Sequence, residues 1–151
     1  MRTVKDILES KHKSFNYIAP DALVIDAINM LNSVNLSYLI VMDGDDYKGI
    51  FSERDYTRNI ILKGRASNTT TVKDAMTTDL PIVNLTDTVE YCMNMMNSHR
   101  TRYLLAYEHQ KFLGVITIHD LLRQVLANKE DVFDSTLTRS LLDTDESSRI
   151  Y

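Results

Sequence analysis

Apolar residues between positions 23 and 34 recur at intervals of three and four residues, as they do on one face of a helix. This face comprises Leu23, Val24, Ala27, Ile28, Met30, Leu31 and Val34. The same phase returns at Val89, Cys92, Met93, Met95 and Met96. The pattern predicts two amphipathic helices. They should begin near Asp21 and Thr86, because these residue types pair with the free N–H groups of a first helical turn.

Each predicted helix precedes two apolar runs of strand length, at 38–42 and 49–51 and again at 103–107 and 114–116. Polar residues at 43–46 and 108–111 predict the turns between them. A last helix is expected from residue 52 to about 63, and from 117 to about 128. Short helices at 4–10 and 72–77 and extended segments at 17–18 and 82–83 should come first. The predicted order is β-α-β-β-α, twice, in an α/β fold.

The two halves are also similar residue by residue. With a shift of 65 positions, residues 18–62 lie over 83–127 with ten identities, where chance would give about three. Residues 4–8 match 72–76 at a shift of 68, so the first copy has three extra residues in its early loop. We therefore expect one repeat at 1–68, a second at 69–129 and a partly helical tail at 130–151.

A short motif occurs once in each copy: Gly, two apolar residues, Ser or Thr, two variable residues and Asp, at 49–55 and 114–120. Together with Val-Lys-Asp-Ala-Met-Thr at 72–77, it resembles the CBS (cystathionine-β-synthase) domain family over residues 4–128. The resemblance implies a stand-alone tandem CBS pair of the Bateman type, with pseudo-two-fold symmetry. It also implies a disk-like homodimer that binds AMP, ADP, ATP, NAD or S-adenosylmethionine in clefts between the repeats and regulates a partner protein, as in energy sensing.

The motif ends in the carboxylates Asp55 and Asp120, each about one turn into a predicted helix. A carboxylate can accept both ribose hydroxyls of a nucleotide, and the resemblance implies this role. The spacing Ser52-x-x-Asp55 and Thr117-x-x-Asp120 is also that of a capping box, in which each side chain bonds the other residue's backbone N–H. Both interpretations are open for each Asp.

Phosphate binding is expected at the starts of the last helices, where N–H groups and the helix dipole attract anions. The candidates are Ser52, Thr117, Arg54, His119, Arg100 and Arg102. In the first copy the positions of the last two are Asn35 and Ser37, so the two clefts should be unequal. An exposed position without a ligand is the alternative for any single arginine.

The adenine ring needs an apolar slot. The resemblance places it against the extended segments, Tyr17 and Ile18 in the first copy and Ile82 and Val83 in the second. Tyr38 and Tyr103, at the starts of the following strands, are candidate walls of this slot. Packing in the core is an equally good explanation for both tyrosines.

Composition and the absence of known motifs argue against several other classes of protein. A net charge of -4 and a pI near 5.5 argue against a nucleic-acid-coating surface. The single cysteine, Cys92, forms no disulfide within the chain, which favours a cytoplasmic location, and no apolar run is long enough for a membrane span. The four histidines lack metal-ligand spacing, and no catalytic or Gly-rich phosphate motif is present.

These observations favour a regulatory nucleotide-binding module that is not an enzyme and requires no cofactor, with AMP, ATP or NAD as the expected ligand. Two alternatives remain open from the sequence. One is an interaction or dimerisation protein of the same fold whose clefts are empty. The other is an enzyme acting on a nucleotide, for which the chain offers no recognisable nucleophile or metal site.

Overall fold

The computed structural model describes residues 2–11 and 16–128. The elements in chain order are α1 (Val4–Ser10), β1 (Tyr17–Ile18), α2 (Val24–Val34), β2 (Tyr38–Asp43), β3 (Asp46–Ser52), α3 (Glu53–Asp55), η1 (Tyr56–Ile61), α4 (Val72–Ala75), β4 (Ile82–Asn84), α5 (Val89–His99), β5 (Tyr103–Glu108), β6 (Lys111–Thr117) and α6 (Ile118–Asn128). This order confirms the predicted α/β repeats. The tail predicted at 130–151 lies outside the described residues.

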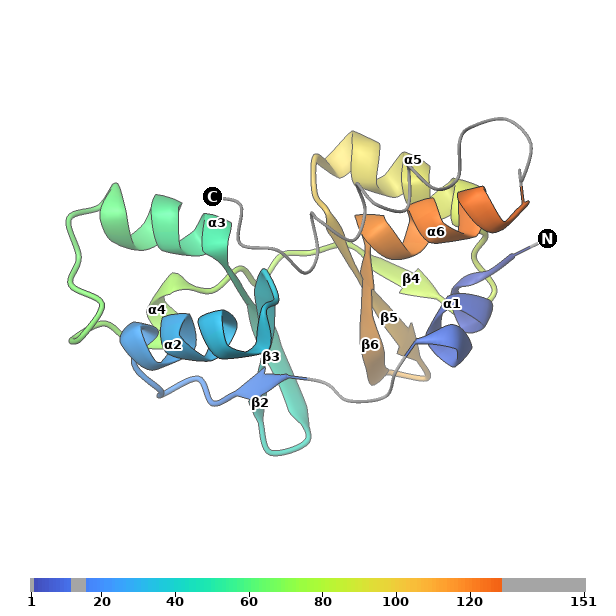
Figure 1. Cartoon of the computed structure of the whole chain (residues 1–151). Helices are drawn as coiled ribbons and strands as arrows, with labels where there is room; N and C mark the ends of the chain where they lie inside the picture. Colours follow the sequence, from blue (N-terminus) through green and yellow to red (C-terminus); the bar gives the residue numbers. More distant parts are fainter. Residues whose placement is uncertain (1, 12–15, 129–151) are drawn as a thin grey trace. The chain divides into compact units, whose positions relative to one another are not determined.

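Each repeat forms a three-stranded mixed sheet, in the order β1-β2-β3 or β4-β5-β6 (Figure 1). The first strand runs parallel to the second, which forms an antiparallel hairpin with the third. The two hairpins have their register shifts at matching places, after Val41 and after Ala106. The duplication seen in the sequence is therefore reproduced down to the irregularities of the strands.

The central helices begin later than the sequence predicts. Helix α2 starts at Val24 and α5 at Val89, not near Asp21 and Thr86. The residue before each helix is extended and forms an isolated bridge with a distant segment, which keeps the preceding turn from joining the helix. These bridges are Leu23–Thr71 and Thr3–Thr88.

The described residues form two compact units that exchange their first helices. One unit contains residues 2–11 and 80–128, and the other contains 16–79; we name them the β4–β6 unit and the β1–β3 unit. Helix α1 thus packs with the strands of the second repeat, and α4 with those of the first. Matching backbone bonds hold both helices: Val4 N–H donates to Asp87 C=O (2.9 Å) and Val72 N–H to Ala22 C=O (2.8 Å).

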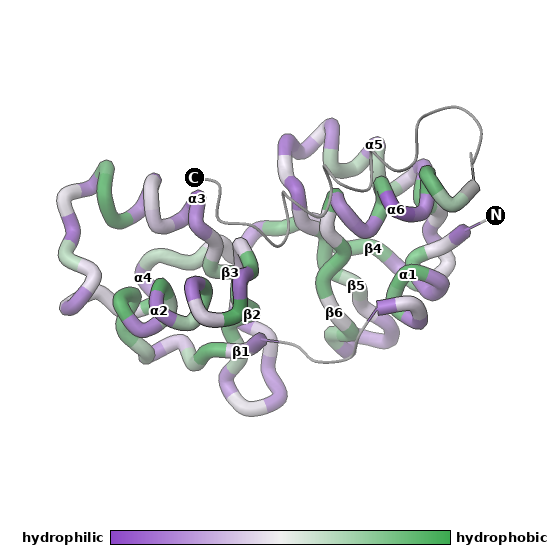
Figure 2. Tube along the Cα trace, viewed as in Figure 1, coloured by the Kyte–Doolittle hydropathy of each residue, from purple (hydrophilic) through white to green (hydrophobic). Residues whose placement is uncertain are grey.

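Each unit buries its own apolar core between one face of the sheet and the helices. In the β4–β6 unit the core comprises Val4, Ile7, Val83, Cys92, Met96, Leu104, Ala106, Ile116 and Leu121. In the β1–β3 unit it comprises Val24, Ala27, Leu31, Leu39, Val41, Phe51, Ile60, Val72 and Ala75. Figure 2 shows the corresponding pattern along the chain, with hydrophobic positions concentrated in the strands and alternating with hydrophilic ones in α2.

The last helices of the two repeats differ. In the β4–β6 unit α6 is a continuous α-helix of 11 residues. In the β1–β3 unit the predicted helix is a single α-helical turn, α3, followed by the π-helical segment η1. The Asn59 side chain in η1 donates to the Ala75 carbonyl (2.8 Å), which ties this segment to α4.

Replacing Gly49 with Ala tests the close approach of β3 to the chain after α4. A Cβ there would lie 2.7 Å from the Thr77 carbonyl oxygen and 2.9 Å from Met76 Sδ, so the chain must shift. We expect the free energy of unfolding to fall by about 1–3 kcal/mol, measured by urea denaturation. Gly44→Ala is the control: its Cβ would meet open space, and only the left-handed backbone costs about 1 kcal/mol. A smaller loss for Gly49→Ala than for Gly44→Ala would contradict the close packing.

Candidate functional site

The buried carboxyl of Asp120 lies where strand β6 passes into helix α6. Its Oδ2 accepts the Thr117 N–H at 2.8 Å, and its own N–H donates to Thr117 Oγ1 at 3.2 Å. These two bonds are those of a capping box. The capping interpretation is therefore confirmed for Asp120, but it occupies only one of the two carboxyl oxygens.

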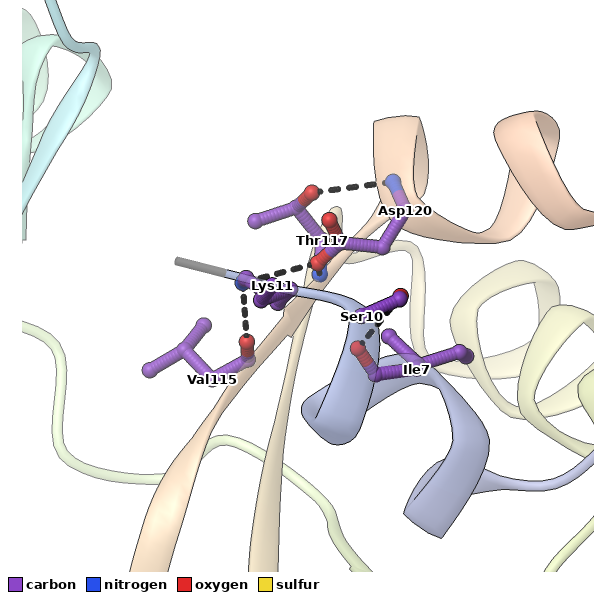
Figure 3. Close-up of polar contacts among 6 residues, drawn as sticks. All are labelled: Ile7, Ser10, Lys11, Val115, Thr117 and Asp120. Atoms are coloured by element: carbon purple, nitrogen blue, oxygen red, sulfur yellow. Dashed lines mark hydrogen bonds and ion pairs between the residues drawn. The ribbon is translucent and has the colours of Figure 1, made fainter. Parts of the chain in front are cut away.

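Lys11 reaches the same carboxyl from the end of α1 (Figure 3). Its Nζ lies 2.9 Å from Asp120 Oδ2 and 2.8 Å from the Val115 carbonyl oxygen. The backbone behind it is fixed, because the Lys11 N–H (3.1 Å) and Ser10 Oγ (2.9 Å) both donate to the Ile7 carbonyl. Asp120 is thus one half of an ion pair formed across 109 positions of sequence.

The other oxygen of Asp120, Oδ1, receives no hydrogen bond from the residues that the structure describes. The residue as a whole is only 8% exposed. Asp120 Oδ1 is thus an acceptor for which the described residues supply no donor, although buried carboxylate groups are normally hydrogen-bonded.

Both oxygens of the matching carboxyl, Asp55, accept hydrogen bonds from the protein. Its Oδ2 accepts both the N–H (2.8 Å) and the Oγ–H (3.0 Å) of Ser52, and Asp55 N–H donates back to Ser52 Oγ (3.2 Å). Its Oδ1 accepts the Thr77 hydroxyl at 2.6 Å. Capping is confirmed here as well, and both carboxyl oxygens of Asp55 already accept hydrogen bonds from the protein.

Burial dominates the electrostatics of Asp55, which is 6% exposed. Desolvation raises the pKa of its carboxyl above 3.8, against the hydrogen bonds from Thr77 and Ser52 and the charge of Arg58, which lower it. The carboxyl therefore holds its proton more tightly in the folded chain than in the unfolded one.

Backbone N–H groups at the start of α6 already have partners within the protein. Thr117 N–H goes to Asp120, and Ile118 N–H donates to the Arg102 carbonyl at 3.0 Å. In the other unit Glu53 N–H likewise donates to the Ser37 carbonyl at 3.1 Å. A phosphate here would thus depend on side-chain cations rather than on a free helix end.

The structure brings some of the predicted phosphate-binding residues together and leaves others apart. Arg102 is exposed and lies beside the start of α6 through its carbonyl bond to Ile118. His119 is half-buried in the first turn of α6. Arg54 is exposed on α3, while Arg100 is exposed at the end of α5, where its backbone is left-handed.

The predicted adenine-binding residues fall into two groups: two tyrosines beside the motif hydroxyls, and four residues in the first strands of the sheets. Tyr38 pairs with Ser52 across the first hairpin, and Tyr103 with Thr117 across the second, so each tyrosine is beside a motif hydroxyl. The remaining four lie in the two first strands: Tyr17 and Ile82 are exposed, Ile18 is half-buried and Val83 is buried in the core. Val83 as a whole is only 1% exposed, so it offers almost no surface to a ligand.

Sequence reasoning missed Lys11 and Thr77, the two residues that meet the motif carboxylates. Both follow a first helix that packs on the other repeat's strands, and the repeat pattern alone does not reveal this exchange. The available signal was the match of 4–8 to 72–76, which places both residues shortly after equivalent helices.

Metal-binding clusters, membrane-spanning helices and the cysteine are the other candidate features in the described part of the chain. No three His, Cys, Asp or Glu side chains within 2–11 and 16–128 are grouped so that they could hold a metal ion. In the same ranges no helix is both long and apolar enough to cross a bilayer. Cys92 is buried in the core of the β4–β6 unit.

The Cys92 thiol should be unreactive in the folded protein. Burial, with a smaller effect of the charge on Asp87, raises the pKa of this thiol to about 11, so little thiolate exists at pH 8. We expect a thiol-specific disulfide reagent at pH 8 to modify the chain only as fast as it unfolds, with complete reaction in denaturant. Rapid modification of the native protein would show that Cys92 is accessible.

Substituting Asp55 by Asn should change how stability depends on pH. Because the folded pKa of Asp55 is raised, its contribution to the free energy of unfolding is fully present below about pH 3.8 and is lost as pH rises through the folded pKa. Urea denaturation between pH 3.5 and 7 should therefore show wild type losing stability relative to Asp55→Asn as pH increases. Asp45→Asn, at an exposed turn, controls for the chemical change itself. A difference that moves in the opposite direction would refute the raised pKa.

Comparisons with known proteins agree with the duplicated architecture. The family model for the CBS domain matches residues 3–62 and again 72–127. The mitochondrial CBS domain-containing protein CBSX3 of Arabidopsis thaliana is 30% identical over 133 residues, which cover 82% of this chain and 65% of the plant protein. The chain thus spans about two thirds of the length of that relative.

Solved structures show the same fold. A protein with CBS domains from Burkholderia ambifaria superimposes with a TM-score of 0.78 at 35% identity, covering 84% of this chain and 96% of that one. The complex of CBSX2 with AMP has a TM-score of 0.71 at 23% identity, covering 85% and 99%. With both repeats matched by the family model and two relatives at 30% identity or more, the chain belongs to the CBS-domain family, as a tandem pair of CBS domains.

Proposed function

We propose that this chain is a non-catalytic regulatory module that binds an adenosine-containing nucleotide: AMP, ADP, ATP or NAD. The observation that carries the proposal is the carboxyl of Asp120. It is buried, its Oδ2 is held by Thr117 and Lys11, and its Oδ1 receives no hydrogen bond within the described residues. A fixed acceptor of this kind fits a ribose hydroxyl, which would supply the missing donor.

Strand β4 supports the adenine part of the proposal. It is an edge strand of its sheet, so its outward backbone groups have no strand partner there, and its Ile82 side chain is 56% exposed. Exposed apolar surface beside the backbone of an edge strand suits an aromatic base with a polar edge. Tyr103, opposite Thr117 in the hairpin, is the proposed wall nearest the ribose.

The regulatory part of the proposal is a shift between states of the protein. A ligand that binds one state more tightly than another changes their populations, and with them the affinity for a partner protein. We propose a homodimer as the assembled form, since Ile61 and Leu62 at the end of η1 are exposed apolar residues that self-association would cover. The AMP complex of CBSX2, which shares this fold, supports the choice of ligand class.

Isothermal titration calorimetry with AMP, ATP, NAD and S-adenosylmethionine tests the proposal. We expect at least one of the first three to bind wild type, and Asp120→Ala to lower that affinity about tenfold or more, because the hydroxyl acceptor is lost. Glu108→Ala, an exposed carboxylate of the same unit, should leave it unchanged. Loss of the cap should cost about 1 kcal/mol of stability, so thermal unfolding must show that the variant is folded. Absence of binding by all four ligands would refute the proposal.

A second candidate is a CBS-fold interaction or dimerisation protein that binds no nucleotide. The observation that favours it is the capping box at both carboxylates, which by itself gives each Asp a structural role. It predicts that Asp120→Ala reduces stability by the capping amount and leaves self-association intact, with no heat from any nucleotide. Cellular location stays a prediction: the single cysteine favours the cytoplasm, while the name of the plant relative is that of a mitochondrial protein.

A further inference from the structure

The ammonium group of Lys11 is positioned to do more than neutralise Asp120. We propose that it binds the phosphate nearest the ribose, so that the β4–β6 unit prefers nucleotides to nucleosides and is the unit that takes the ligand. This inference rests on the proposed nucleotide-binding function and adds to it the residue that selects a phosphorylated ligand.

The number of N–H donors on the Lys11 ammonium supports a third hydrogen-bond acceptor for it. An ammonium group carries three N–H donors, and two of them go to Val115 C=O (2.8 Å) and Asp120 Oδ2 (2.9 Å). The described residues provide no acceptor for the third. Since the side chain is 25% exposed, this donor can reach a bound anion without breaking either existing bond.

Charge favours a phosphate as that anion. An unpaired Asp120 carboxylate would repel a phosphate attached to the ribose that it binds. Lys11 cancels this charge at 2.9 Å and leaves Oδ1 available, so one side chain can accept a hydroxyl while its partner meets the adjoining phosphate. The first N–H groups of α6 cannot substitute for the cation, because Thr117 and Ile118 already donate theirs within the protein.

The β1–β3 unit lacks both halves of this arrangement. The neutral Thr77 hydroxyl fills Asp55 Oδ1 at 2.6 Å. No lysine or arginine among the described residues forms an ion pair with Asp55. The residues that follow α1 and α4 therefore make the two carboxylates unequal: Asp120 has an ion-paired lysine and an oxygen without a donor among the described residues, whereas both oxygens of Asp55 have donors and Arg58 acts on it only as a nearby charge.

Titrations of AMP and adenosine into Lys11→Met and wild type, followed by backbone amide chemical shifts, test this role. The two ligands differ only in the phosphate. We expect Lys11→Met to weaken AMP binding about tenfold or more and adenosine binding by less than about twofold. Lys11→Arg, which keeps the charge, should recover most of the AMP affinity. Lys111→Met, which removes an exposed charge from β6, is the matched control and should bind both ligands as wild type does.

Each other outcome rejects a specific statement. If wild type binds AMP and Lys11→Met binds it equally well, the phosphate role of Lys11 is wrong while the proposed function stands. If Lys11→Met loses AMP and adenosine affinity to the same extent, Lys11 is only a structural support of Asp120. If wild type binds neither AMP nor adenosine nor any other nucleotide tested, the proposed function itself fails, and the inference with it.

Discussion

The junction between a hairpin and the helix that follows it depends in both units on one buried carboxylate. Asp55 and Asp120 each fix the first turn of a helix by bonding the backbone three residues earlier. Burying such a group without partners is costly, so the surrounding chain has to supply donors. The segment that arrives from the exchanged helix provides them, as Thr77 in one unit and Lys11 in the other. The carboxylate thus links the cap, the exchanged helix and the candidate site.

The two units meet the same requirement with different chemistry. In the β1–β3 unit Thr77 N–H donates to the Ile50 carbonyl at 2.8 Å, so the chain after α4 runs as a short extension of the sheet. In the β4–β6 unit the matching carbonyl, Val115, accepts the Lys11 ammonium at the same distance instead. The donor to this carbonyl is thus a backbone N–H in the β1–β3 unit and a side-chain ammonium in the β4–β6 unit. The ammonium also adds a positive charge beside Asp120. This difference leaves Asp120 Oδ1 without a donor among the described residues, whereas both oxygens of Asp55 have one.

Most of the architecture was predictable from the sequence because it follows from periodicity and duplication. Apolar spacing identified α2 and α5, the alternation of apolar runs and turns identified both hairpins, and the internal repeat joined them into equivalent units. Helix starts were misplaced because bonds to distant segments, such as Val24 N–H to Thr70 C=O, decide where a helix can begin. The π-helical winding of η1 also leaves no signal in the apolar pattern.

The candidate site was only partly predictable for a related reason. Asp55 and Asp120 stand in a local motif, and both their capping bonds and their equivalence in sequence could be read from it. What distinguishes them comes from residues 22 and 109 positions away, which no local spacing reveals. The side chain of Val83 faces the core while that of Ile82 is exposed, although both occupy the same predicted strand.

The exchange of first helices also sets an order of events during synthesis. The β1–β3 unit is built from one continuous stretch, 16–79, so it can close soon after that stretch leaves the ribosome. Helix α1 emerges earlier but has to wait for strand β6, more than a hundred residues later, before Lys11 meets Val115. Helix α1 is therefore synthesised before the β1–β3 unit yet finds its partners after it, and until then its apolar side chains are open to chaperones or to the α1-accepting surface of another copy.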